Sequence, residues 1–135
     1  MILAFPSMQF GGQEHNDVNK IKATAAKFGV NFPLMSLTNI NGKNTHDVFK
    51  YLRRNSILYD KKKNVVREVP WNFSKFLVSG DGKKIRFYNP RVNPVKIVPD
   101  IRKYFEKLKK EGEQNPDFDP RSDNLSDLDV PSTDM

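Results

Sequence analysis

The stretch Pro70-Trp71-Asn72-Phe73-Ser74-Lys75-Phe76-Leu77-Val78 decides the fold of this chain. It contains the only Trp, and its last three residues have the composition of a buried strand. The glycine-bearing segment 79–82 then predicts a turn, and residues 84–88 alternate polar and apolar, as a half-buried strand does. We therefore expect an antiparallel hairpin over residues 71–88, with Trp71 and Asn72 at its mouth.

The rest of the chain predicts a first strand and three helices around this hairpin. Residues 1–5 form a short apolar run that ends at Pro6. Helices are expected from an N-cap at Asn16 or Asp17 to Gly29, from a cap at Thr45 to about Asn55, and from Pro99 to Gly112. A lone strand followed by a helix usually needs a parallel partner. The expected fold class is therefore α/β, a mixed sheet with an antiparallel edge hairpin and helices on its faces.

Three stretches carry further expectations about packing. In the first helix, spacings of three and four predict that four side chains face the core: Val18, Ile21, Ala25 and Phe28. Residues 30–35 are apolar but interrupted by Pro33, which indicates a loop packed onto the core. Residues 57–69 fit no element, and their three consecutive lysines indicate a solvated loop apex.

Charge divides the 135 residues into two parts. Residues 111–135 contain eight acidic residues and one Arg, whereas residues 1–110 contain 22 basic and 8 acidic ones. We expect one domain over residues 1–110 and an acidic, disordered tail over residues 111–135. The basic body either attracts an anionic molecule, nucleic acid or membrane surface, or is a solvated surface that the tail partly neutralises.

Residue types that are missing exclude several kinds of chemistry. The chain has no Cys, so these residues form no disulfide, thiolate zinc site or cysteine nucleophile. For the two histidines, His15 and His46, a solvated surface position is a simpler interpretation than metal ligation, and no metal is expected. No apolar run approaches the length of a membrane span. The expected location is the cytoplasm, with the mitochondrion as the alternative.

Two motifs closely resemble the glutathione peroxidase family. They are Phe5-Pro6-Ser7-Met8-Gln9-Phe10-Gly11-Gly12-Gln13-Glu14 and the stretch 71–78. Shorter matches are residues 28–33, 41–44, 51–52, 81–83, Tyr88 and Pro90, so the resemblance covers roughly residues 2–105. It implies a thioredoxin-like fold. It also implies reduction of hydrogen peroxide and of organic or lipid hydroperoxides by a cysteine or selenocysteine, with electrons drawn from glutathione or thioredoxin.

The resemblance assigns catalytic positions to Gln9, Trp71 and Asn72, which match three members of the family's tetrad. A thiol attacks peroxide as the thiolate, and neutral amide and indole donors around the sulfur favour that anion. The same donors can stabilise the leaving oxygen. From composition alone the alternative is a core aromatic at Trp71 and turn residues at Gln9 and Asn72.

Three departures from the family pattern limit the functional prediction. The family's nucleophile lies upstream of the motif Ile2-Leu3-Ala4-Phe5-Pro6, so we expect the nucleophile and an N-terminal strand-helix portion to be missing here. Ser7-Met8 stands where the family often has Cys-Asn, and Thr24 lies near the resolving cysteine of thioredoxin-dependent members. Ser7 is no substitute, because peroxide needs an oxidisable atom and no His is placed to activate the hydroxyl.

Two functions therefore remain open. One is a partial chain of a functional glutathione peroxidase. The other is a catalytically inactive relative that acts as a binding or structural subunit, with a partner protein over its exposed sheet edge. No cofactor is expected beyond the thiol co-substrate, and no nucleic-acid partner. A final cluster either attracts anionic glutathione or phospholipid or is a solvated face: Arg53, Arg54, Lys61, Lys62 and Lys63.

Overall fold

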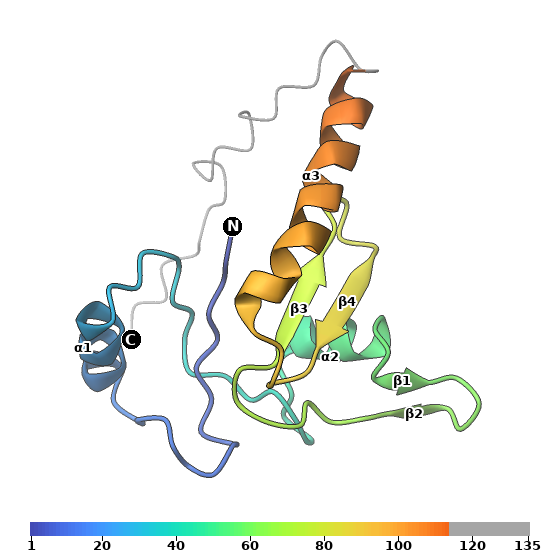
Figure 1. Ribbon diagram of the computed structural model, residues 1–135. Helices are drawn as coiled ribbons and strands as arrows, with labels where there is room; N and C mark the ends of the chain where they lie inside the picture. The colour runs from blue at the N-terminus through green and yellow to red at the C-terminus, as the bar shows by residue number, and fades with distance from the viewer. Residues whose placement is uncertain (114–135) are drawn as a thin grey trace. The chain divides into compact units, whose positions relative to one another are not determined.

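The computed structural model describes residues 1–113, which fall into two compact units. Met1–Asn93 forms the first, and the second begins at Pro94. The first unit contains α1 (Val18–Lys27), α2 (Asp47–Arg54), β1 (Tyr59–Asp60), β2 (Val65–Val66), β3 (Lys75–Val78) and β4 (Ile85–Tyr88) (Figure 1). The second contains the 3-10 helix η1 (Pro94–Ile97) and α3 (Val98–Glu113). Of the predicted tail, residues 111–113 belong to α3, and residues 114–135 lie outside the described residues.

The predicted hairpin is present as β3 and β4. The strands pair antiparallel, with Phe76 opposite Phe87 and Val78 opposite Ile85. The turn closes where the N–H of Gly82 donates to the carbonyl oxygen of Ser79 at 2.8 Å. Gly82 has a φ of +72°, a conformation that a residue without a Cβ adopts at little cost. The hairpin prediction over residues 71–88 is confirmed, but the predicted burial of its first strand is wrong, because no residue of β3 is buried and Val78 is 43% exposed.

The strand predicted over residues 1–5, called the first strand below, is reduced to one isolated parallel bridge, and its partner lies in residues predicted to be a loop. Ala4 forms a parallel bridge with Leu34. The N–H of Ala4 donates to the carbonyl oxygen of Pro33 at 3.0 Å. The N–H of Met35 donates to the carbonyl oxygen of Ala4 at 2.8 Å. Within the described residues, sheet pairing thus consists of this bridge and two antiparallel pairs, β1–β2 and β3–β4.

The undetermined stretch 57–69 contains a small hairpin that sequence patterns did not reveal. Tyr59 pairs with Val66 and Asp60 with Val65. The carboxylate of Asp60 accepts from the N–H groups of Lys62 and Lys63 at 3.0 and 3.1 Å, which closes the turn. The lysine apex is exposed, as predicted.

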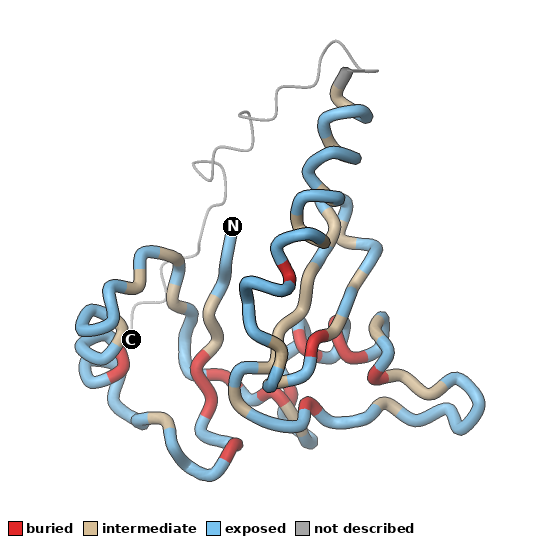
Figure 2. The backbone as a smooth tube through the Cα atoms, in the orientation of Figure 1, coloured by how far each residue is buried: buried red, intermediate tan, exposed pale blue. Residues whose placement is uncertain are grey.

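Helix α1 begins and ends as predicted but buries less than its pattern indicated. The carboxylate of Asp17 accepts from the N–H of Asn19 at 2.7 Å, so the N-cap is confirmed. Of the four predicted core residues only Ile21 is buried, while Val18 is 57% and Phe28 75% exposed. The reason is position, because α1 lies apart from α2 and the β3–β4 hairpin (Figures 1 and 2). The spacing of apolar residues predicts which face of a helix is apolar. It does not predict whether another element packs against that face.

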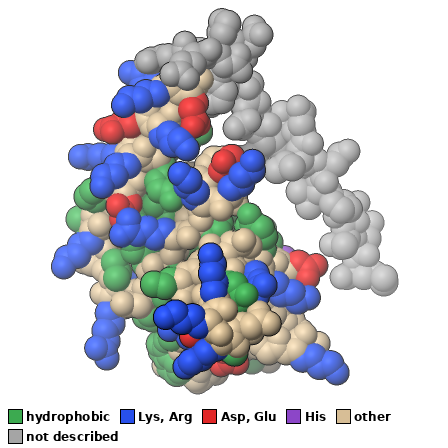
Figure 3. All heavy atoms as spheres, turned by 90° about the vertical axis from the view of Figure 1, so that its right-hand side faces the viewer, with side chains coloured by type: hydrophobic (Ala, Val, Ile, Leu, Met, Phe, Trp, Pro, Cys, Tyr) green, Lys and Arg blue, Asp and Glu red, His purple; other side chains and the backbone are tan. Residues whose placement is uncertain are grey.

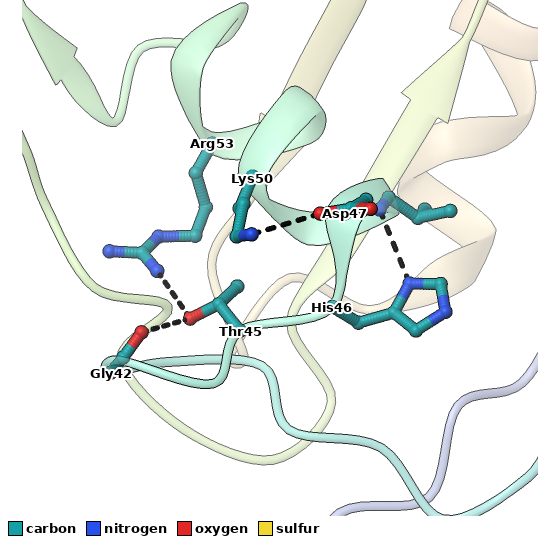
Figure 4. Close-up of polar contacts among 7 residues, drawn as sticks. Gly42, Thr45, His46, Asp47, Lys50 and Arg53 are labelled. Atoms are coloured by element: carbon teal, nitrogen blue, oxygen red, sulfur yellow. Dashed lines mark hydrogen bonds and ion pairs between the residues drawn. The ribbon is translucent and has the colours of Figure 1, made fainter.

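The N-cap of helix α2 lies one residue later than predicted. The imidazole Nδ1 of His46 accepts from the N–H of Val48 at 3.2 Å and is the N-cap (Figure 4). The hydroxyl of Thr45 instead donates to the carbonyl oxygen of Gly42 at 2.6 Å, closing the preceding turn. The prediction of a Thr45 cap is therefore wrong. The predicted end of the helix is confirmed, with Asn55 at the C-cap.

Six buried side chains form the core that joins these segments (Figure 2): Phe10, Ile40, Phe49, Leu52, Leu58 and Val69. Partly buried residues pack against them, including Phe5 and Phe76. Phe49 connects the two, with ring centroids 5.1 Å from Phe5 and 6.2 Å from Phe76. The core therefore fixes α2 against the first strand and the hairpin. It also anchors the loops that carry the candidate site, through Phe10, Ile40 and Val69.

Candidate functional site

Gln9 uses both ends of its carboxamide on one turn of the backbone. Its Oε1 accepts from the N–H groups of Ile40 and Asn41 at 2.6 and 2.9 Å. Its Nε2 donates to the carbonyl oxygen of Asn41 at 2.9 Å. The side chain thus satisfies backbone groups that have no strand partner, as buried and turn backbone requires. The consequence is that the loop beginning at Gln9 and the turn at residues 39–44 are held together.

Asn41 continues this connection to the segment before Trp71. Its Nδ2 donates to the carbonyl oxygen of Val69 at 2.8 Å, and its Oδ1 accepts from the N–H of Val69 at 2.9 Å. Val69 is 3% exposed, so the carboxamide satisfies backbone groups with little access to water. Sequence reasoning did not assign a role to Asn41. Its only signal was a place in one of the shorter motif matches, residues 41–44.

Asn72 contacts the loop that begins at Gln9, and so links the segment after Val69 back to it. Its Nδ2 donates to the carbonyl oxygen of Phe10 at 3.3 Å and to Oε1 of Gln13 at 3.0 Å. A carboxamide nitrogen carries two hydrogens, and both are used here. Gln13 is a second residue whose part in the site sequence reasoning missed.

Trp71 lies against the same loop. Its ring centroid is 6.1 Å from that of Phe10. A Cβ added to Gly11 would approach the indole Cη2 to 3.2 Å, so glycine is what lets the loop pass this closely. Trp71 is nevertheless 47% exposed. The neighbouring Phe73 has a φ of +62° and is 82% exposed, a strained conformation of the kind that concentrates at functional sites.

The structure brings the three predicted residues to one loop. The side-chain amides of Gln9 and Asn72, however, are hydrogen-bonded to protein groups. Trp71 and Asn72 contact residues 10–13, and Gln9 is the residue just before them. The amides of Gln9 and Asn72 hold backbone and side-chain partners. Turning either one toward a sulfur would break bonds that each contribute about 1 kcal/mol. The catalytic assignment therefore stays a prediction. In the structure the side chains of Gln9 and Asn72 hold the loops of the site together.

Two further positions from the sequence occupy ordinary structural places. Ser7 is 6% exposed, and its Oγ accepts from the N–H of Gln9 at 3.3 Å. Thr24 lies on α1 and is exposed. In residues 1–113, no group of three or more His, Asp or Glu side chains is placed to hold a metal ion. Over the same residues, every helix is too short or too polar to cross a bilayer.

Comparison with known proteins gives consistent matches. The family profile described as "Glutathione peroxidase" matches residues 1–53. The chain is 40% identical over 102 residues to "Probable glutathione peroxidase 2" of Arabidopsis thaliana, covering 75% of this chain and 57% of that protein. It is 38% identical over 104 residues to "Glutathione peroxidase-like peroxiredoxin GPX5" of Chlamydomonas reinhardtii, covering 76% and 61%.

A solved structure, "Crystal structure of Trgpx in apo form", superposes with a TM-score of 0.56 at 32% identity, over 77% of this chain and 56% of that one. The arrangement is thus a thioredoxin-like α/β fold. Within that class, the chain belongs to the glutathione peroxidase family, as the two motifs indicated. It spans about three fifths of the length of the curated relatives named above.

Proposed function

We propose that this chain is the scaffold part of a peroxidase that, in its complete form, reduces hydrogen peroxide or organic and lipid hydroperoxides with a thiol reductant. The observation that supports the proposal most is the meeting of Trp71 and Asn72 with residues 10–13, next to Gln9. Two motifs separated by some sixty residues in sequence are thereby joined. They are the motifs on which the family resemblance rests.

In this proposal a cysteine or selenocysteine outside these residues takes one oxygen from the hydroperoxide, and water or an alcohol leaves. Two electrons from glutathione or thioredoxin then restore the thiol or selenol. In this proposal the amides of Gln9 and Asn72 exchange protein partners for the reacting groups, and with the indole of Trp71 they orient the peroxide and favour the anionic nucleophile. No cofactor besides the thiol co-substrate is needed, and we assign the protein to the cytoplasm.

The absence of cysteine from the 135 residues makes the proposal testable on the purified chain. Hydroperoxide consumption is measured with glutathione and, separately, with thioredoxin and its reductase. We expect no turnover above the rate in buffer, because three donors without a thiolate have nothing to activate. Rapid consumption at enzyme-like rates would show that another group in the chain performs the chemistry and would refute the assignment.

A second candidate is an inactive family member that serves as a subunit. Within the described residues, β3 pairs only with β4, and the first strand has a single bridge, so strand edges are left open. Such edges are templates for a partner's strand. The nucleotide sequence upstream of the Met1 codon separates the two candidates. A frame that continues into a strand and loop with a cysteine codon, or with a TGA that encodes selenocysteine, supports the first. An in-frame TAA or TAG stop supports the second.

A further inference from the structure

Arg53 is a buried cation whose partners are all neutral. The residue is 9% exposed and lies in the last turn of α2. Its Nε donates to the carbonyl oxygen of Arg67 at 3.0 Å, and its Nη1 contacts the carbonyl oxygen of Ile40 at 3.4 Å and the hydroxyl of Thr45 at 3.5 Å. The ion pairs Lys50–Asp47 and Lys107–Glu111 do not include Arg53.

The charge on Arg53 is therefore poorly compensated. Burial lowers the pKa of its guanidinium below the ordinary value, and the carboxylate of Glu68 acts in the opposite direction to a smaller extent. Glu68 itself is exposed to solvent. A buried charge is costly unless an opposite charge accompanies it, so an anion placed beside this group would be stabilised.

An open cavity of about 440 Å³ has Arg53 among its lining residues. Three of its lining residues are cationic, and none is acidic: Lys50, Arg53 and Arg54 line it together with Gly42, Thr45, Tyr51, Asn55 and Val66. Figure 4 shows Arg53 extending from α2 toward Thr45, with Lys50 on the same helix. Small-molecule sites occupy about 300–1,000 Å³, so the space suits a small ligand. A second cavity of about 420 Å³ shares Arg54 and adds Lys61.

The other two cations of the lining, Arg54 and Lys50, are each able to contact a ligand. The guanidinium of Arg54 stacks on the ring of Tyr59, with its Cζ 3.7 Å from the centroid, which restrains it without using its charge. Lys50 pairs with Asp47 at 2.9 Å, but both side chains are well exposed. Exposed pairs are weak, so Lys50 can exchange Asp47 for a ligand. Within Met1–Asn93 the sequence has 16 basic and 6 acidic residues, and Figure 3 shows basic side chains over much of one face.

We propose that this cavity binds a small oxyanion of the phosphate class, with Arg53 as its buried anchor and Arg54 and Lys50 as outer donors. A guanidinium fork matches two oxygens of a tetrahedral anion, and the lysine adds a point charge. Three cations suit the charge of a phosphate, about −1.5 to −2 at neutral pH, better than that of a single carboxylate. The surrounding positive field favours the approach of such an anion.

The test measures inorganic phosphate binding to the purified chain by titration calorimetry at constant ionic strength. One variant, K50Q/R54Q, removes two lining charges. The control variant, K62Q/K63Q, removes two charges from the exposed β1–β2 turn, outside both cavity linings. Arg53 is left intact, because it also tethers the backbone at Ile40 and Arg67. Circular dichroism checks that each variant keeps the fold.

We expect saturable binding, weakened about tenfold or more in K50Q/R54Q by the loss of charge-assisted hydrogen bonds and changed less than about twofold in the control. Failure of the unmodified chain to bind, or equal weakening in both variants, would overturn the proposal, since equal loss indicates only general charge attraction. Vesicles of phosphatidylcholine with phosphatidic acid identify the source of the phosphate. Binding that K50Q/R54Q abolishes points to a lipid headgroup, and phosphate binding without vesicle binding points to a soluble phosphate ester.

Discussion

Replacing Asn41 with Ala removes the side chain that ties the turn at residues 39–44 to the segment before Trp71. Two hydrogen bonds to the backbone of Val69, of 2.8 and 2.9 Å, are lost. Each is worth about 1 kcal/mol, and the nearly buried groups left behind add a desolvation penalty, so we expect a loss of about 2–4 kcal/mol in unfolding free energy. The assay is urea unfolding followed by the fluorescence of the single Trp, which lies two residues after Val69.

For a domain of this size, that loss lowers the urea midpoint by about 1–2 M or more. The matched control is Asn44→Ala in the same turn, where the side chain is exposed and the expected change is within about 0.5 kcal/mol. Because Gln9 holds the backbone of Asn41, the double variant Q9A/N41A should lose measurably less than the sum of the single variants. Equal effects at positions 41 and 44, or strict additivity with Gln9, would refute the proposed linkage.

Two matched pairs of substitutions test the loop that meets Trp71. A thiol introduced by Ser7→Cys should react with an aromatic disulfide reagent only after unfolding, because the side chain at position 7 is 6% exposed. The thiol of Met8→Cys should react at once, because position 8 is 43% exposed. Equal reaction rates in the native state would contradict the burial of Ser7. Gly11→Ala should destabilise by about 1 kcal/mol more than Gly12→Ala. Both glycines have positive φ, but only at position 11 does the new Cβ crowd the indole, at 3.2 Å. Equal unfolding midpoints for the two glycine variants would show that the indole yields without cost.

Local patterns predicted the elements whose signals are local. The hairpin at residues 71–88 followed from apolar runs around a glycine turn, and the start of α1 followed from Asp17. The cap of α2 was missed, because Thr45 and His46 are adjacent acceptors and the sequence does not say which one the preceding turn will use. Here the hydroxyl of Thr45 is needed by Gly42.

The candidate site was predictable in its members but not in its connections. Gln9, Trp71 and Asn72 were found by motif, yet the contacts that unite their loops depend on Asn41 and Gln13. A side chain that bonds to backbone 28 residues away, as Asn41 does, leaves no periodic signal in the sequence. In the same way, the apolar spacing of α1 could not reveal that its neighbours would lie elsewhere.

The carboxamides of Gln9 and Asn41 also divide the chain into regions of different tolerance to change. Segments tied to one another by hydrogen bonds should open as one cooperative unit, so the amide hydrogens of Ile40, Asn41 and Val69 should show a common free energy of opening in hydrogen exchange. The β1–β2 turn is closed by local hydrogen bonds, from Lys62 and Lys63 to Asp60 and from Tyr59 to Asn64, so lengthening it disturbs no distant bond. An inserted peptide tag should therefore be accepted after Lys62 and rejected after Asn41.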